Sequence, residues 1–160
     1  MLAEQPSSEG DVVEFRRQFE VGRETLFQAW TDADALKAWF GPDGVETRGA
    51  DIDLRVGGKY RLELHLPSGD IVVHHGAYLE IVPPEKLVFS WILEGQSCGS
   101  DNDEPVTTKV TVLFHAVGDH QTELHLVHEG LPTQTSRDNH GFGWKGCFNS
   151  LGDYVTTELS

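Results

Sequence analysis

Apolar and polar residues alternate through most of the middle of this chain, from about residue 45 to residue 128. The segment KYRLELHL shows this most clearly, because Tyr60, Leu62, Leu64 and Leu66 alternate with charged or polar side chains. A period of two is typical of a strand with one buried face. The same pattern predicts further strands at residues 12–21, 71–82, 86–93, 108–117 and 122–130, with turns at the sequences PSGD and GDH.

Two short segments near the N-terminus have a helical period instead. In GRETLFQAW the apolar side chains fall on one helical face, which predicts a first short helix. A second short helix follows, which Thr31 or Asp32 can cap. It carries Trp39 and Phe40 at its end, where a Gly-Pro pair stops it.

The C-terminal segment predicts one long amphipathic helix, from about residue 136 to residue 157. Its apolar side chains have the spacing i, i+3, i+4, i+7 and i+11, and they are Trp144, Cys147, Phe148, Leu151 and Val155. Glycines at 141, 143, 146 and 152 lie in or beside this helix. Because each interior glycine costs about 0.5–1 kcal/mol relative to alanine, they need an explanation. A loose turn at the mouth of a cavity and a close approach of helix to sheet both remain open.

Strands that follow one another without intervening helices favour an α+β fold over a parallel, doubly wound sheet. We expect one antiparallel sheet of six or seven strands, with two short helices after the first strand. The C-terminal helix is the only element long enough to cover the apolar face of this sheet. Residues 1–10 are expected to be disordered, and residues 11–160 to form a single domain.

The charge of the chain changes the list of partners. With 26 acidic and 12 basic side chains the formal net charge is −14, which disfavours nucleic acids and anionic membrane surfaces. No apolar run approaches the roughly 20 residues that span a bilayer, and the acidic start of the sequence lacks the features of a signal peptide. We therefore expect a soluble, cytoplasmic protein, either a monomer or a homodimer.

No motif of known chemistry stands out. The chain has no nucleophile elbow, phosphate-binding loop, dinucleotide fingerprint or zinc-protease motif, and its two cysteines lie far apart. His74 and His75 are neighbours on one strand and point to opposite faces, so they do not share a metal ion. Most of the histidines are expected at the surface. We predict no metal site and no cofactor, and the sequence names no enzyme.

Several phrases together resemble one known family. They are ETLFQAWTDADALKAWFGPDG, DLRVGGKYRLEL, GAYLEIVPPEKLVFSW, TELHLVHEGL and GFGWKGCFNSLGDYV, in that order, from about residue 12 to residue 155. The chain resembles the AHSA-type branch of the START-like (SRPBCC, Bet v 1-like) superfamily, which is related to the C-terminal domain of the Hsp-90 ATPase activator. The resemblance implies a helix-grip fold, in which a curved antiparallel sheet wraps around the C-terminal helix with a cavity between them. Within it, the pair Gly57-Gly58 would permit a bulge or sharp bend at a strand start.

The expected cavity defines the candidate ligand-binding residues. They are Trp39, Tyr60, Leu62, Leu64, Phe89, Trp91, Val112, Phe114, His128, His140, Trp144 and Phe148. These side chains are aromatic-rich, which suits both a filled core and an apolar pocket with a few polar groups. His128 and His140 likewise fit two roles, as hydrogen-bonded core histidines or as groups that orient a ligand.

Three functions follow, in order of preference. The first is non-enzymatic binding of a small hydrophobic molecule in the cavity. The second, implied by the resemblance, is a co-chaperone role in the stress response with a chaperone as partner, although the chain lacks room for the activator's separate N-terminal domain. The third is a small cavity enzyme, a cyclase or hydrolase, with His128 or His140 as acid or base and Tyr60 as the second polar group.

Overall fold

The computed structural model describes residues 12–41, 44–93, 106–131 and 134–159. The segment expected to be disordered, residues 1–10, and the acidic loop at 94–105 lie outside the described residues. The strands are β1 Val12–Phe19, β2 Glu46–Ile52, β3 Lys59–His65, β4 Ile71–Val82, β5 Lys86–Leu93, β6 Val106–Gly118 and β7 Gln121–Glu129. The helices are α1 Arg23–Thr31, α2 Ala33–Trp39 and α3 Gln134–Tyr154, and a π-helical turn, Val155–Leu159, extends the last one.

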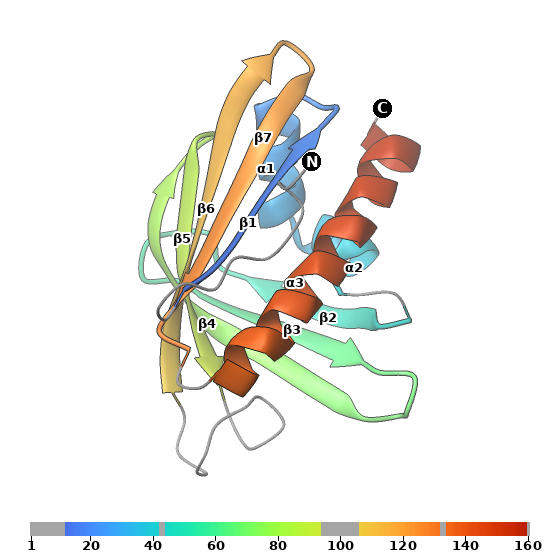
Figure 1. Cartoon of the computed structure of the whole chain (residues 1–160), viewed down its shortest axis with the longest axis vertical. Coiled ribbons are helices and arrows are strands. Elements are labelled where there is room, and N and C mark those ends of the chain that lie inside the picture. Colours follow the sequence, from blue (N-terminus) through green and yellow to red (C-terminus); the bar gives the residue numbers. More distant parts are fainter. Residues whose placement is uncertain (1–11, 42–43, 94–105, 132–133, 160) are drawn as a thin grey trace.

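The seven strands form one antiparallel sheet in the order β1-β7-β6-β5-β4-β3-β2. Figure 1 shows the sheet strongly curved, with α3 running across its inner face and α1 and α2 on the same side. The predicted α+β helix-grip architecture, with two short helices between β1 and β2, is confirmed.

The alternating pattern is what buries one face of this sheet. In β7 the side chains of Thr122, Leu124, Leu126 and His128 are buried, and their neighbours are partly exposed. The register places His128 opposite Val110 in β6, so the inner faces of the two strands are continuous. The core therefore lies between this face and the helices.

Two local features define where α2 begins and ends. The Asp32 carboxylate accepts a hydrogen bond from the backbone N–H of Ala35 at 3.0 Å, so Asp32 and not Thr31 caps α2. The helix ends at Trp39, and Phe40 already has extended backbone geometry. Gly41 then has φ +112°, which suits glycine. As a result, Trp39 and Phe40 leave the end of α2 in different directions.

The long C-terminal helix buries the predicted face. All five residues of its apolar stripe, from Trp144 to Val155, are buried, and Phe148 packs against Phe15 and Phe19 of β1 with ring centroids 5.6 and 6.0 Å apart. Across the parts of the chain that the structure describes, no helix combines the length and the apolar character needed to cross a membrane.

The glycine pair before β3 lies in a tight turn outside the strand. Gly57 has φ +87°, and a Cβ on Gly58 would lie 2.1 Å from the Asp53 carbonyl oxygen. Hydrogen bonds of 2.9 Å to the backbone of Tyr78 hold the turn against β4. The sharp bend expected from the sequence is present, and its cause is the close approach of two backbone segments.

Candidate functional site

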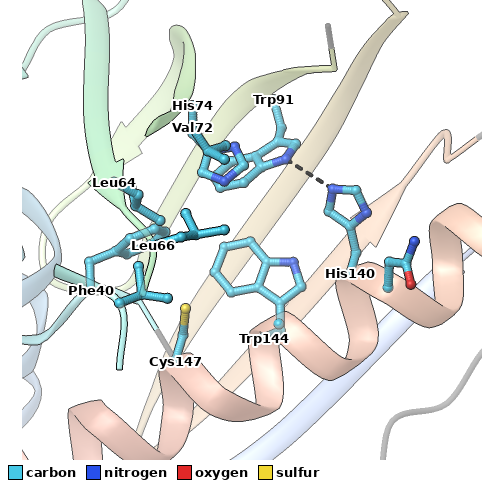
Figure 2. A pocket seen from close by; sticks show the side chains of 12 residues that line it. Phe40, Leu64, Leu66, Val72, His74, Trp91, His140, Trp144 and Cys147 are labelled. Atoms are coloured by element: carbon cyan, nitrogen blue, oxygen red, sulfur yellow. Dashed lines mark hydrogen bonds between the residues drawn. The ribbon is translucent and has the colours of Figure 1, made fainter. Parts of the chain in front are cut away.

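A cavity of about 230 Å³ lies between the inner face of the sheet and α3. Most of its wall is apolar, and the lining residues are Phe40, Val45, Leu64, Leu66, Val72, His74, Trp91, Asn139, His140, Gly143, Trp144 and Cys147. None of these described residues carries a carboxylate, an ammonium or a guanidinium group. Figure 2 shows the labelled side chains converging from the end of α2, from the region of β3, β4 and β5, and from α3.

Two tryptophans form the floor of the cavity. Trp91 of β5 and Trp144 of α3 pack with ring centroids 5.2 Å apart and planes at 49°. Phe40 packs against both, with centroids 6.3 Å from Trp91 and 6.1 Å from Trp144. The sequence predicted that Trp91 and Trp144 share one apolar groove, and both line this cavity.

His128 lies behind the tryptophans and is not part of the cavity wall. Its side chain is fully buried, its Nδ1 accepts a hydrogen bond from Trp144 Nε1–H at 3.0 Å, and its Nε2 lies 2.7 Å from Thr108 Oγ1. Because the Thr108 hydroxyl donates to the Trp91 carbonyl at 2.7 Å, His128 Nε2 is the protonated nitrogen that donates to Thr108. His128 is thus a hydrogen-bonded core histidine, the first of the two roles that its sequence position allowed.

Burial, followed by the nearby His140 and His74, lowers the pKa of His128 well below its ordinary value. Protonating Nδ1 would also break the hydrogen bond from Trp144. His128 therefore stays neutral and holds the Trp144 indole in place, and both of its nitrogens are occupied.

His140, for which the sequence left two roles open, lines the cavity. It comes from the second turn of α3, and its Nε2 accepts a hydrogen bond from Trp91 Nε1–H at 3.3 Å. The indole N–H groups of Trp91 and Trp144 are therefore both satisfied by histidines within the protein. The two tryptophans present apolar ring surface to the cavity.

His74 is a cavity residue that the sequence analysis did not single out, because most of the histidines were expected at the surface. Its ring stacks on Trp91, with centroids 4.4 Å apart and planes at 27°. Desolvation, followed by the nearby His140 and His75, lowers the pKa of His74 to about 3. The signal was available in the alternation of β4, because His74 is paired with the inward-facing Leu62 while His75 is paired with the exposed Arg61.

Trp39 does not line the cavity, although the sequence analysis placed it there. Its ring turns toward α1, where Nε1–H donates to the Ala29 carbonyl at 2.8 Å and the ring packs against Trp30 at 4.9 Å. Phe40 takes the position that was expected for Trp39. The reason is the end of α2, after which extended backbone directs the Phe40 side chain toward α3.

The other predicted residues divide into three groups. Leu64 lines the cavity. Tyr60, Leu62 and Phe89 line a second void of about 20 Å³, room for about one water molecule, and the Tyr60 hydroxyl donates to the Ser90 carbonyl at 2.6 Å. Val112, Phe114 and Phe148 are fully buried core residues that line neither space.

The thiol of Cys147 in the cavity wall and the phenol of Tyr60 in the second void are both held protonated. Burial raises the pKa of the Cys147 thiol to about 12, which keeps it protonated. Burial also raises the pKa of the Tyr60 phenol, and its O–H already donates a hydrogen bond to the Ser90 carbonyl. Among the residues that the structure describes, no three His, Cys, Asp or Glu side chains come together as metal ligands.

Solved structures share this fold over nearly their whole length. The chain resembles a protein from Chromobacterium violaceum (25% identity, TM-score 0.77), with 91% of this chain and 96% of that one covered. It also resembles the AHSA1 protein from Silicibacter pomeroyi (23% identity, TM-score 0.79), with 92% of this chain and 99% of that one covered. A third similar structure is CalU16 from Micromonospora echinospora (23% identity, TM-score 0.66), with 97% of this chain and 85% of that one covered.

Curated proteins provide no match to this chain. The family described as "Activator of Hsp90 ATPase homolog 1-like protein" has a model that matches residues 20–156. That span begins at the end of β1 and includes every later strand and helix, α3 among them, so it contains every element that lines the cavity. The chain therefore belongs to the family of activator of Hsp90 ATPase homolog 1-like proteins.

Proposed function

We propose that this protein binds a small hydrophobic molecule, without chemical conversion, in the cavity between the sheet and α3. The observation that carries the proposal is a cavity of about 230 Å³ walled by aromatic and aliphatic side chains, with two histidines as its inner polar groups. Apolar pockets with a few placed polar groups are the usual form of a small-molecule site. An apolar cavity of about 150 Å³ already accepts benzene.

The volume limits the size of the ligand. A molecule with one or two rings fits, whereas a long acyl chain or a multi-ring polyketide requires the walls to move apart. The flat surfaces of Trp91 and Trp144 favour an aromatic or otherwise planar body.

Binding is favoured over catalysis because the titratable groups are already engaged or held in unreactive forms. Both nitrogens of His128 are hydrogen-bonded, to Thr108 and to Trp144, and the Cys147 thiol stays protonated. His140 Nε2 is occupied by Trp91. A cyclase or hydrolase needs a group that gains or loses a proton near pH 7, whereas His74, whose pKa is lowered to about 3 by burial, stays neutral there.

A co-chaperone role is the second candidate, and membership of the family favours it. Its test is the ATPase turnover of an Hsp-90 chaperone with and without a stoichiometric amount of the purified protein. We expect no more than weak acceleration. A several-fold stimulation would place the co-chaperone role first.

The test of ligand binding uses the tryptophans as reporters. One- and two-ring aromatic compounds should quench or shift the fluorescence of Trp91 and Trp144, and they should raise the melting temperature. At a ligand concentration one hundred times the dissociation constant, the gain in unfolding free energy is about 2.7 kcal/mol.

A cavity-filling variant provides the control. A Cβ added at Gly143 meets no atom within 4 Å, so Gly143→Leu can place its side chain in the cavity without a backbone clash. We expect this variant to fold and to lose binding. Asn149→Leu, on the exposed side of the same helix, should bind like the unaltered protein. Equal binding by both variants would contradict the proposal.

A further inference from the structure

We propose that the molecule bound in this cavity is uncharged and presents a hydrogen-bond acceptor, such as a ring carbonyl, to the Nε2–H of His74. This inference rests on the proposed ligand-binding function and adds the chemical class of the ligand. Three observations carry it: the position of His74, the hydrogen bonds of the other polar groups, and the absence of charge among the described lining residues.

His74 is held in place by its stacking on Trp91, so its ring has a defined edge toward the cavity (Figure 2). Of its two nitrogens, Nδ1 is buried and has no hydrogen-bond partner. Nε2 is not among the buried unpartnered atoms of the described residues, and no hydrogen bond joins it to them. Nε2 is therefore the nitrogen on the accessible edge of the ring.

This geometry selects one tautomer. A neutral imidazole has one N–H donor and one lone pair. If the proton were on Nδ1, a buried N–H would have no acceptor, and buried donors without a partner are rarer in folded proteins than buried acceptors without one. The proton therefore lies on Nε2, and His74 offers a donor to whatever occupies the cavity.

The hydrogen bonds of the two tryptophans and of His140 favour His74 for this role. The indole N–H groups of Trp91 and Trp144 donate to His140 and His128. His140 Nε2 is the acceptor in the first of these bonds. Asn139 lines the cavity from an exposed position, where water competes for its amide.

The absence of charged side chains among the described lining residues disfavours ionised ligands. No described residue of the wall is Asp, Glu, Lys or Arg, and the low pKa of His74, about 3, keeps its ring neutral near pH 7. A carboxylate or an ammonium group would lose its hydration without meeting an opposite charge. A neutral acceptor loses much less and regains a hydrogen bond from Nε2–H.

The experiment compares two probes of nearly equal shape, 1-tetralone and tetralin, which differ by one carbonyl group. Dissociation constants are measured by tryptophan fluorescence for the unaltered protein and for His74→Phe, which keeps an aromatic ring on Trp91 and removes both nitrogens. We expect the dissociation constant of 1-tetralone to rise about three- to tenfold in the variant, while that of tetralin stays equal or falls. His75→Phe is the matched control, because His75 points to the opposite face of the sheet.

Infrared spectroscopy tests the donor directly. The carbonyl stretch of bound 1-tetralone should lie at lower wavenumber in the unaltered protein than in His74→Phe, since a hydrogen bond from Nε2–H weakens the C=O bond. As a further arm, 1-naphthoate should bind at least tenfold more weakly than 1-tetralone at pH 7.

The outcomes separate the two proposals. If neither tetralone nor tetralin binds the unaltered protein, the cavity is not a site for ligands of this size, and both proposals fail. If both bind and His74→Phe changes their affinities by the same factor, ligand binding stands and the role of His74 is overturned. Tight binding of 1-naphthoate would overturn the assignment to uncharged ligands.

Discussion

The hydrogen bonds of individual side chains explain why His128 is a neutral histidine within this core. His128 accepts from the Trp144 indole and donates to Thr108, and Thr108 donates to the backbone of β5. The chain of bonds thus joins α3, β7, β6 and β5 through four polar groups, each satisfied. Because an unpaired buried polar group costs about 1–3 kcal/mol, loss of one member affects the others.

Trp144 combines this polar role with ring contacts to Trp30, Phe40 and Trp91. Trp144→Ala should lower the free energy of unfolding by about 3–5 kcal/mol, as large aromatic truncations in cores do. Urea denaturation followed by circular dichroism measures the change. A melting temperature within a degree or two of the unaltered protein would mean that Trp144 does not pack as the structure shows.

The neutral histidines also predict how stability depends on pH. Burial lowers the folded-state pKa of both His74 and His128 below the ordinary 6.5, so the unfolded chain binds protons that the folded protein does not. Stability is therefore complete above pH 6.5 and falls as the pH is lowered, toward about pH 3 for His74. The limiting slope is about 1.4 kcal/mol per pH unit for each histidine.

Urea denaturation at intervals between pH 7.5 and pH 5 measures this slope. The interval avoids most of the titration of Glu14, whose pKa is lowered from 4.5 chiefly by its hydrogen bond with His125. His74→Phe removes one titrating group, so the number of protons taken up on unfolding should fall by about one and the slope by up to about 1.4 kcal/mol per pH unit. An unchanged slope would show that His74 is protonated in the folded state.

At the scale of elements, a glycine in α3 and a glycine in β4 lie in opposite surroundings, one beside open space and one against a neighbouring strand. Gly143 lines the cavity, and a Cβ there meets nothing within 4 Å. Gly76 of β4 lies against β5, and a Cβ there would lie 2.0 Å from the Ser90 carbonyl oxygen. The first glycine leaves space open in the cavity, and the second permits close contact of two strands in a curved sheet.

This contrast gives a paired prediction. Gly143→Ala should raise the free energy of unfolding by about 0.5–1 kcal/mol, because alanine is the better helix former and has room. Gly76→Ala should destabilise the protein, because its Cβ forces β4 and β5 apart. Thermal and urea denaturation of both variants measure the effect. Destabilisation by Gly143→Ala would mean that the helix needs glycine at this position for packing.

At the scale of the whole molecule, the cavity belongs to elements far apart in the sequence. Its wall comes from the end of α2, from β3, β4 and β5, and from α3, so none of these forms the site alone. Ser150 of α3 donates to the Gly41 carbonyl at 2.8 Å, which ties the helix to the segment after α2. A ligand bound in this cavity would therefore contact both the sheet and α3.

We accordingly expect ligand binding to slow amide hydrogen exchange on both sides of the cavity. The protected amides should lie in β4 and β5 and in the part of α3 around Trp144, with little change at the β6–β7 turn. Exchange measured by mass spectrometry, with and without a saturating one- or two-ring ligand, tests this. Protection confined to the outer face of the sheet would place the ligand elsewhere.

The sequence by itself determined the elements and the faces that they bury. Alternation predicted Tyr60, Leu62 and Leu64 on the inner face, and helical spacing predicted the buried stripe from Trp144 to Val155; both are confirmed. These patterns are local, because a side chain's face follows from the strand or helix period alone. For the same reason, the position of His74 on the inner face was present in the alternation of β4.

Only the tertiary structure decided which buried side chains meet a cavity. His128 and Trp39 lie on buried faces, as predicted, yet hydrogen bonds to Trp144 and Ala29 turn them into core structure, while Phe40 and His74 face the open space. Such choices depend on contacts between α1, α2, α3 and the sheet, and these contacts join residues as far apart as Gly41 and Ser150. A local period carries no information about them, because it fixes a side chain's face but not its neighbour across the core.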